Sequence, residues 1–340
     1  MKRKLRVAVL VHPSMVPPET REGYSDNEAY AWKTEFDVVT TLRALGHDVR
    51  VVAVADELTP IREMVEQFDP AIVFNLLEEF LGRQEFDHHV VSLLELMQIP
   101  YTGCHPRGLI LARDKALSKK LLAYHHLGVP KFAVFPRRRR IVRPKGLEFP
   151  LIVKSLVHEA SLGISQASVV DSDEKLRERV TFIHERHGSD AIAEQYVHGR
   201  ELYVGMLGNS RVQVLPVWEL LFENLAPGAV PIATAAVKHN TEYQRRRGIF
   251  QQRAEDLPPA LVQHVVRTTK RIARILDLDG YARIDYRLSP DGKLYFLEAN
   301  PNPDVASSEE FASAAEEAGM PYPDLIQRIL RLGLQRAAVR

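Results

Sequence analysis

Residues 281–300 carry the pattern that most narrows the fold. Positions 281–288 alternate between apolar and polar side chains with a period of two, which predicts a β-strand with two unlike faces. Ser289-Pro290-Asp291-Gly292 is a turn signal, and positions 293–300 return as a second strand. If the loop holds two or four residues, one face of this hairpin collects four polar side chains, Arg283, Asp285, Glu298 and Asn300.

Two carboxylates and an amide oxygen suit a hard divalent cation such as Mg²⁺. A Mg²⁺ ion held by few carboxylates takes its other ligands from phosphates and water. The alternative is an ordinary salt-bridged sheet face, in which Arg283 and Arg287 neutralise Asp285 and Glu298. The polar, proline-punctuated end of the second strand, residues 298–303, argues against a plain surface strand.

The rest of the chain predicts an α/β domain followed by two α+β lobes. Strand and helix signals alternate over the first hundred residues, which indicates a mostly parallel sheet covered on both faces. Short strands dominate from residue 149, among them 151–154, 164–170 and 191–196. A long helix is expected at 258–278. The charged stretch 223–253 has little regular pattern and is interpreted as a loop that closes over a ligand.

Composition excludes several classes of protein. With 340 residues, the chain has room for two or three domains. Forty-five basic against 44 acidic residues argue against a nucleic-acid partner, and no apolar run approaches the roughly 18 residues of a membrane span. Cys104 is the single cysteine, so a disulfide framework is excluded. We expect a cytoplasmic protein.

Several segments, in this order, resemble the ATP-grasp ligases, and specifically their D-alanine–D-alanine ligase branch. They are residues 93–103, Arg113-Asp114-Lys115, Phe149 to Lys154, Glu194 to Val197, Val237-Lys238, and the hairpin. The resemblance implies an ATP-grasp fold with an N-terminal parallel-sheet domain. The expected divisions are an N-terminal α/β substrate domain at 1–112, a central lobe at 113–198, and a C-terminal lobe with the metal site at 199–340.

The resemblance also implies roles for individual residues. Lys115 and Lys154 would reach the ATP phosphates. The hinge that binds adenine would be Glu194, Gln195, Tyr196 and Val197, with Glu201 on the ribose. Two Mg²⁺ ions, with Mn²⁺ as an alternative, would be held by Asp285, Glu298 and Asn300. Catalysis would involve Arg283 as the oxyanion stabiliser. It would also involve Lys238, which matches the lysine of the family's flexible loop, and Ser161 in the loop of small residues at 159–163.

Departures from the family pattern cluster where the amino acids would bind. Ala160 stands where one of two adjacent serines is usual, His239 replaces a tyrosine, and Asp304 replaces a glycine. The family's histidine-glycine motif is missing, and its N-terminal carboxylate maps loosely to Glu28 or its neighbours. A carboxylate at Asp304 would repel an incoming substrate carboxylate.

We therefore expect an ADP-forming ligase that joins a small-molecule carboxylate to an amine through an acyl phosphate, with a substrate other than two D-alanines. True D-alanine–D-alanine ligase is one alternative. A nucleotide-binding module without catalysis is another, against which the three metal-ligand candidates argue. The resemblance also implies a homodimer. Neither the two substrates nor their stereochemistry follows from the sequence.

Overall fold

The computed structural model describes residues 4–157, 164–234, 237 and 240–338, and its strands form three sheets. The first sheet is parallel and has the order β2-β1-β3, from β1 (Arg6–Val11), β2 (Asp48–Ala53) and β3 (Ile72–Asn75). One face packs on α3 (Thr59–Phe68) and α4 (Asp87–Leu96), and the other on α2 (Lys33–Ala44) and α12 (Tyr322–Ala337). Both faces are covered, as the run of buried residues in β1 predicts.

The second sheet is antiparallel and forms the central lobe. Its order is β4-β7-β5-β6, from β4 (Phe132–Phe135), β7 (Ala191–Gln195), β5 (Leu151–Ser155) and β6 (Val169–Val170). The amphipathic helix α7 (Asp173–His187) buries Leu176, Val180 and Ile183 against it. The prediction of a strand over residues 164–170 was wrong, because Gln166–Ser168 forms a 3₁₀ turn (η3) and only the two residues of β6 pair with β5.

The third sheet is antiparallel and carries the predicted hairpin. Its order is β10-β9-β8-β11-β12, from β10 (Ile249–Arg253), β9 (Gln213–Phe222), β8 (Arg200–Leu207), β11 (Tyr281–Leu288) and β12 (Leu294–Pro301). Apolar side chains of one face pack on α10 (Pro259–Ile275), α5 (Pro106–Arg113) and α6 (Lys115–Tyr124). The prediction of an irregular stretch at 223–253 was wrong for its end, where α9 (Thr241–Arg247) leads into β10.

The hairpin has the predicted shared face, but a β-bulge is needed to produce it. Near the turn Leu288 pairs with Leu294, so the loop holds five residues rather than two or four. That register alone would put Asp285 and Glu298 on opposite faces. The register shifts between Asp285 and Tyr286, because Leu297 is an extra residue in β12. Asp285 then pairs with Glu298, and Arg283 with Asn300.

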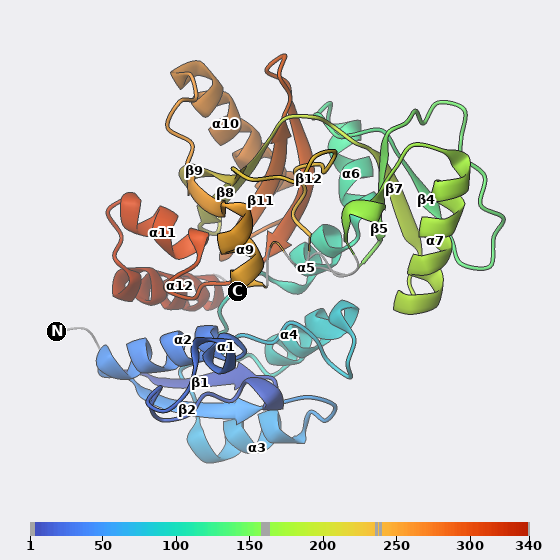
Figure 1. Cartoon of the computed structure of the whole chain (residues 1–340). Coiled ribbons are helices and arrows are strands. Elements are labelled where there is room, and N and C mark those ends of the chain that lie inside the picture. The colour runs from blue at the N-terminus through green and yellow to red at the C-terminus, as the bar shows by residue number, and fades with distance from the viewer. Residues whose placement is uncertain (1–3, 158–163, 235–236, 238–239, 339–340) are drawn as a thin grey trace.

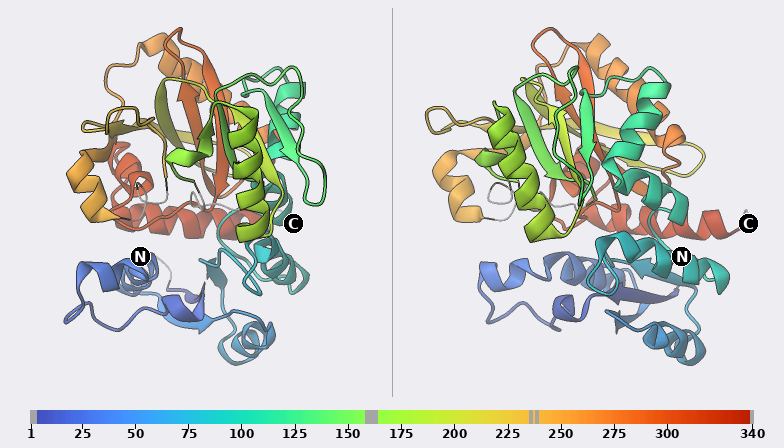
Figure 2. Two further views of the ribbon diagram at one scale, coloured as in Figure 1. Left: turned by 45° about the vertical axis from the view of Figure 1, so that its right-hand side comes forward. Right: turned by 90° about the vertical axis from the view of Figure 1, so that its right-hand side faces the viewer.

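Chain segments far apart in sequence join the N-terminal domain to the rest. Figures 1 and 2 show that α12 lies between the parallel sheet and the C-terminal lobe. It buries Leu325, Ile326 and Ile329 in one cluster with Val7 and Val9 of β1. The elements α5 and α6 pack with the third sheet, although the sequence puts them at the boundary near residue 112. The three-domain division therefore remains a proposal.

The remaining short elements lie in the connecting segments. These are η1 (Pro13–Met15), α1 (Asp26–Tyr30), η2 (Gln84–Phe86) and α11 (Glu310–Glu317). None of the described helices is both long and apolar enough to cross a membrane.

Candidate active site

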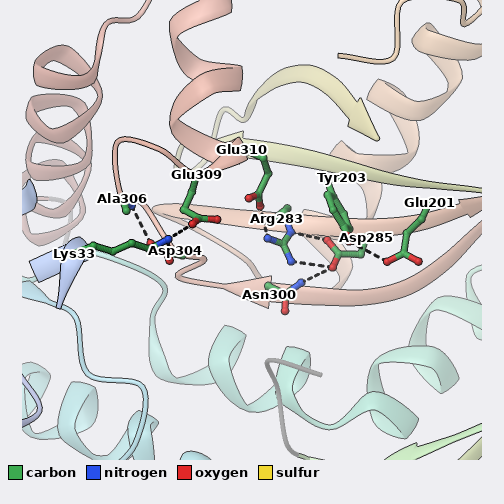
Figure 3. A network of polar contacts seen from close by, with 10 residues as sticks. All are labelled: Lys33, Glu201, Tyr203, Arg283, Asp285, Asn300, Asp304, Ala306, Glu309 and Glu310. Carbon is green, nitrogen blue, oxygen red and sulfur yellow. Dashed lines mark hydrogen bonds and ion pairs between the residues drawn. The ribbon is translucent and has the colours of Figure 1, made fainter. Parts of the chain in front are cut away.

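The polar face of the third sheet gathers side chains from three strands. Figure 3 shows Arg283 and Asp285 of β11 next to Asn300 of β12, with Tyr203 and Glu201 of β8 beside them. The register explains this arrangement, because Tyr203 pairs with Asp285 on one side and Glu298 pairs with it on the other. Directly opposed residues of an antiparallel sheet share a face.

Arg283 is held by two carboxylates. Its Nε donates to Asp285 Oδ1 at 2.7 Å and its Nη2 to Asp285 Oδ2 at 3.0 Å, while Nη1 donates to Glu310 Oε1. The guanidinium also lies over the Tyr203 ring, 4.7 Å from its centroid. Asn300 Nδ2 donates to Asp285 Oδ2 at 3.0 Å. The alternative of a salt-bridged face thus describes part of what is seen, since Arg283 pairs with Asp285.

The donor set fits a hard cation that is shared with phosphates. The described part of the chain contains no group of three His, Cys, Asp or Glu side chains arranged to hold a metal. Asp285, Glu298 and Asn300 offer two carboxylates and one amide oxygen, which is the small protein share that Mg²⁺ takes when phosphates and water complete its shell. To bind it, Asp285 would share its carboxylate between Arg283 and the ion, and the Asn300 amide would present its oxygen.

Four buried charges lie behind this face. Glu194 is fully buried at the end of β7, with Lys119 Nζ at 3.0 Å from one of its oxygens and Lys154 Nζ at 3.0 Å from the other. Lys119 also donates to the carbonyl of Leu297. Lys115 Nζ lies 3.8 Å from Glu298 Oε2. Both predicted phosphate lysines, Lys115 and Lys154, therefore lie near the predicted metal ligands.

Burial and pairing set the charge of these groups. Burial by itself lowers the pKa of Lys154, but the carboxylates of Glu194, Glu298 and Glu201 outweigh it and leave the pKa above the ordinary value. Lys119 is more strongly desolvated, and its pKa falls to about 8 despite Glu194. The two lysines hold the pKa of Glu194 below its usual range against the effect of burial. At neutral pH the cluster of Lys119, Lys154 and Glu194 therefore carries two positive charges and one negative charge.

One pocket brings together most residues of the predicted ATP site. Its lining includes Lys154, all four hinge residues, Glu201, Asp285 and Glu298. Glu201 is already engaged there, since Arg287 Nη2 donates to it at 2.7 Å and the Tyr203 hydroxyl donates at 3.0 Å. The Tyr196 hydroxyl is buried and has no hydrogen-bond partner among the described residues. A ligand in this pocket could supply one.

A second cleft of about 860 Å³ adjoins the same face. Arg283 and Asn300 line it from the third sheet, Lys33 lines it from α2, and the loop after β12 contributes Asp304 and Glu309. Lys33 forms an ion pair with Glu309, and its Nζ lies 3.9 Å from Asp304 Oδ2. Asp304 Oδ1 also accepts from Thr34 Oγ1 at 2.7 Å and from Ala306 N at 2.9 Å.

Sequence reasoning missed some residues of this cleft. Lys33, Glu309 and Glu310 were not predicted, although the acidic pair Glu309-Glu310 shortly after the metal strand could have indicated the latter two. Glu28 is exposed and its carboxylate accepts hydrogen bonds from Ser25 at the start of α1, whereas its neighbours Ala29 and Tyr30 line the cleft. The substrate contact of Glu28 stays a prediction. Three predicted residues lie outside the described part of the chain: Ser161, Lys238 and His239.

Comparison with solved structures establishes the class of fold. The D-alanine–D-alanine ligase of Bacillus anthracis superposes with a TM-score of 0.78 over 98% of this chain and 99% of that one, at 20% sequence identity. The three sheets, with a pocket lined by Lys154 of β5 and by Asp285 and Glu298 of the hairpin, thus form an ATP-grasp fold, which agrees with the fold predicted from the sequence.

Comparison with sequences establishes the family. The family model for the C-terminal part of D-alanine–D-alanine ligases matches residues 121–331. A D-alanine–D-alanine ligase of Nitratidesulfovibrio vulgaris is 30% identical over 317 residues, covering 91% of this chain and 97% of the relative. An uncharacterised protein of Sinorhizobium fredii, y4sG, is 32% identical over 304 residues, covering 88% and 87%. The chain belongs to the D-alanine–D-alanine ligase family, and it is an ADP-forming, ATP-using ligase of C–N bonds.

Proposed function

We propose that this ligase uses MgATP to join a small carboxylate to an amine through an acyl phosphate, and that its substrates are not two D-alanines. The observation that supports the proposal most is a convergence on one sheet face. Lys115 lies near Glu298 there, and Asp285 and Glu298 lie beside Arg283, at the border between the pocket that Lys154 lines and the 860 Å³ cleft.

The lysines would act on the nucleotide. Lys154 and Lys115 offer compact positive charges that can neutralise phosphate oxygens as the γ-phosphoryl group moves to the substrate carboxylate. When bound by Asp285, Glu298 and Asn300, Mg²⁺ would supply further charge neutralisation at those phosphates. Glu194 would keep Lys154 in place, since its carboxylate is the nearest anion to that ammonium.

Arg283 would act on the acyl group. The acyl phosphate forms when a carboxylate oxygen attacks the γ-phosphorus and ADP leaves. The amine then attacks the acyl carbon, the carbonyl oxygen gains negative charge, and phosphate departs as the tetrahedral intermediate collapses. A guanidinium fixed beside this position stabilises that oxygen. Arg283 lines the cleft from the same face as the metal-ligand candidates, which is the position this role requires.

The charges in the cleft argue against a second D-alanine. Asp304 and Glu309 line it, and the single ammonium of Lys33 lies near both carboxylates, so it compensates only part of their charge. A substrate carboxylate about 4 Å from one of these groups would be repelled by roughly 1 kcal/mol or more, depending on the local dielectric. An amine without that carboxylate avoids the penalty.

The proposal is tested by ADP release from MgATP against a panel of amino acids, small carboxylates and amines. We expect stimulation by a carboxylate together with an amine, and a ligated product in the mass spectrum. Stimulation by D-alanine alone would instead identify a true D-alanine–D-alanine ligase. ATP binding without stimulation by any compound would favour a module that binds nucleotides and has lost catalysis.

A further inference from the structure

Glu310 is a buried carboxylate that the proposed mechanism leaves without a role. It is the first residue of α11, and its side chain is 4% exposed. Its Oε1 accepts from Arg283 Nη1, on the edge of the guanidinium that Asp285 does not use. Figure 3 shows Arg283 between the two carboxylates, with Glu310 and Asp285 on different sides of it.

Binding of a cation at Asp285 creates a conflict for Arg283. The same two oxygens of Asp285 that accept from Arg283 are the oxygens available to an ion. An ion bound there would compete for the lone pairs of these oxygens and would weaken the two charge-assisted hydrogen bonds that fix the plane of Arg283. Among the described residues, its other contacts are Glu310 and the Tyr203 ring. An arginine with no partner would be free to leave the place where the acyl oxygen is expected.

We propose that Glu310 is a positioning residue, which keeps Arg283 in place when Asp285 binds a divalent cation. The inference rests on the proposed function, because it assumes that this face holds the cation. Glu310 does not contact the reacting atoms in this scheme. Its carboxylate acts through Arg283, and it also lowers the cost of separating Arg283 from Asp285.

Two measurements separate this role from a merely structural one. Calorimetric titration of Mn²⁺ into the protein, with a nonhydrolysable ATP analogue present, reports how readily Asp285 is released. Turnover at saturating metal then reports the placement of Arg283. We expect Glu310→Gln to raise the Mn²⁺ dissociation constant about tenfold, because Arg283 then competes for Asp285 alone. We also expect kcat to fall at least tenfold at saturating metal.

Two further variants make the test specific. Glu317→Gln removes the same charge from the other end of α11, where Glu317 pairs with Arg253 at 2.6 Å, and should change neither measurement. Glu310→Asp keeps the charge but withdraws the carboxylate. It should bind Mn²⁺ within about threefold of the wild type and still lose kcat, which a purely electrostatic role would not predict. This variant also decides the matter if Glu310→Gln does not fold.

The proposal is overturned if Glu310→Gln binds Mn²⁺ and turns over like the wild type. It is overturned as well if Glu317→Gln weakens Mn²⁺ binding as much as Glu310→Gln does. It is also overturned if Glu310→Asp retains full kcat. The Mn²⁺ titration needs no turnover. If the wild type ligates none of the compounds offered, the proposed function fails, yet the titration still shows whether Glu310 controls the release of Asp285.

Discussion

Replacing Glu194 with glutamine should create a defect in stability that depends on pH. The carboxylate lies 3.0 Å from both Lys119 and Lys154, and all three groups are buried. At an effective dielectric constant of about 20, each contact contributes roughly 5 kcal/mol of attraction. Without the carboxylate, two buried ammonium groups face each other. If both stayed charged, the loss of stability would exceed the roughly 3–5 kcal/mol that breaking one ordinary buried ion pair costs.

The protein can limit this cost by releasing a proton. Lys119 has a pKa of about 8 in the native state, against an ordinary value of 10.5, so Lys119 rather than Lys154 releases the proton. Deprotonating it at pH 7 costs at most about 5 kcal/mol, at 1.36 kcal/mol per pKa unit. We therefore expect Glu194→Gln to lower the free energy of unfolding by about 4 kcal/mol at pH 7.

The sign of the pH dependence follows from the protons bound in each state. In the variant the native state has lost the Lys119 proton and the unfolded state keeps it, so stability rises by about 1.4 kcal/mol per pH unit. In the wild type the same rise begins only near pH 8. The deficit of Glu194→Gln should thus shrink from about pH 6.5 to 8 and stay constant above.

Urea unfolding followed by circular dichroism at pH 6.5, 7, 8 and 9 measures this deficit. Glu219→Gln is the matched control: Glu219 is buried and pairs with Arg200 at 2.8 Å, but Arg200 cannot release its proton and keeps Asp256 as a second partner. Its deficit should be smaller and independent of pH. A deficit below about 1 kcal/mol for Glu194→Gln, or one that does not change between pH 6.5 and 8, would refute the reasoning.

Three further outcomes are expected. Glu298→Gln should abolish ADP release while leaving the unfolding temperature within a few degrees of the wild type, and near-normal turnover would contradict the metal assignment. Burial, with smaller contributions from Glu78 and Asp304, raises the pKa of Glu35 from its ordinary value of 4.5 to about 8, so the native protein loses stability as pH rises from about 4.5 to 8. Glu35→Gln should therefore gain about 3 kcal/mol over the wild type between pH 5 and 7.5, which paired urea titrations would show. Thr34→Val removes the 2.7 Å hydrogen bond to Asp304 and should cost about 1 kcal/mol in the same assay, whereas an unchanged midpoint would mean that water replaces this contact.

Local patterns predicted the hairpin because its first strand has a period of two and a turn signal follows it. The shared face was predicted correctly from a wrong premise about the loop. A five-residue loop alone would have put Asp285 and Glu298 on opposite faces of the sheet, and the extra residue Leu297 restores their pairing. A bulge of this kind depends on packing across the sheet, so the residue types of one strand do not reveal it.

The cleft was harder to predict than the nucleotide pocket. The residues of the pocket follow one another in a recognisable order, whereas Lys33 and Glu309 meet only because α2 lies across the loop that follows β12. Their sequence separation is 276 residues, and no local signal links them. Glu194 was expected to serve through its place at the hinge. Its role as the shared partner of Lys119 and Lys154 depends on burial, which the sequence did not show.

The packing of α12 has a consequence for biosynthesis. Because Leu325, Ile326 and Ile329 complete the apolar layer beside β1, the parallel sheet lacks part of its covering until these residues have emerged from the ribosome. Nascent chains that expose this sheet early would be natural clients for chaperones. Folding of the parallel sheet ahead of the rest of the chain is therefore disfavoured.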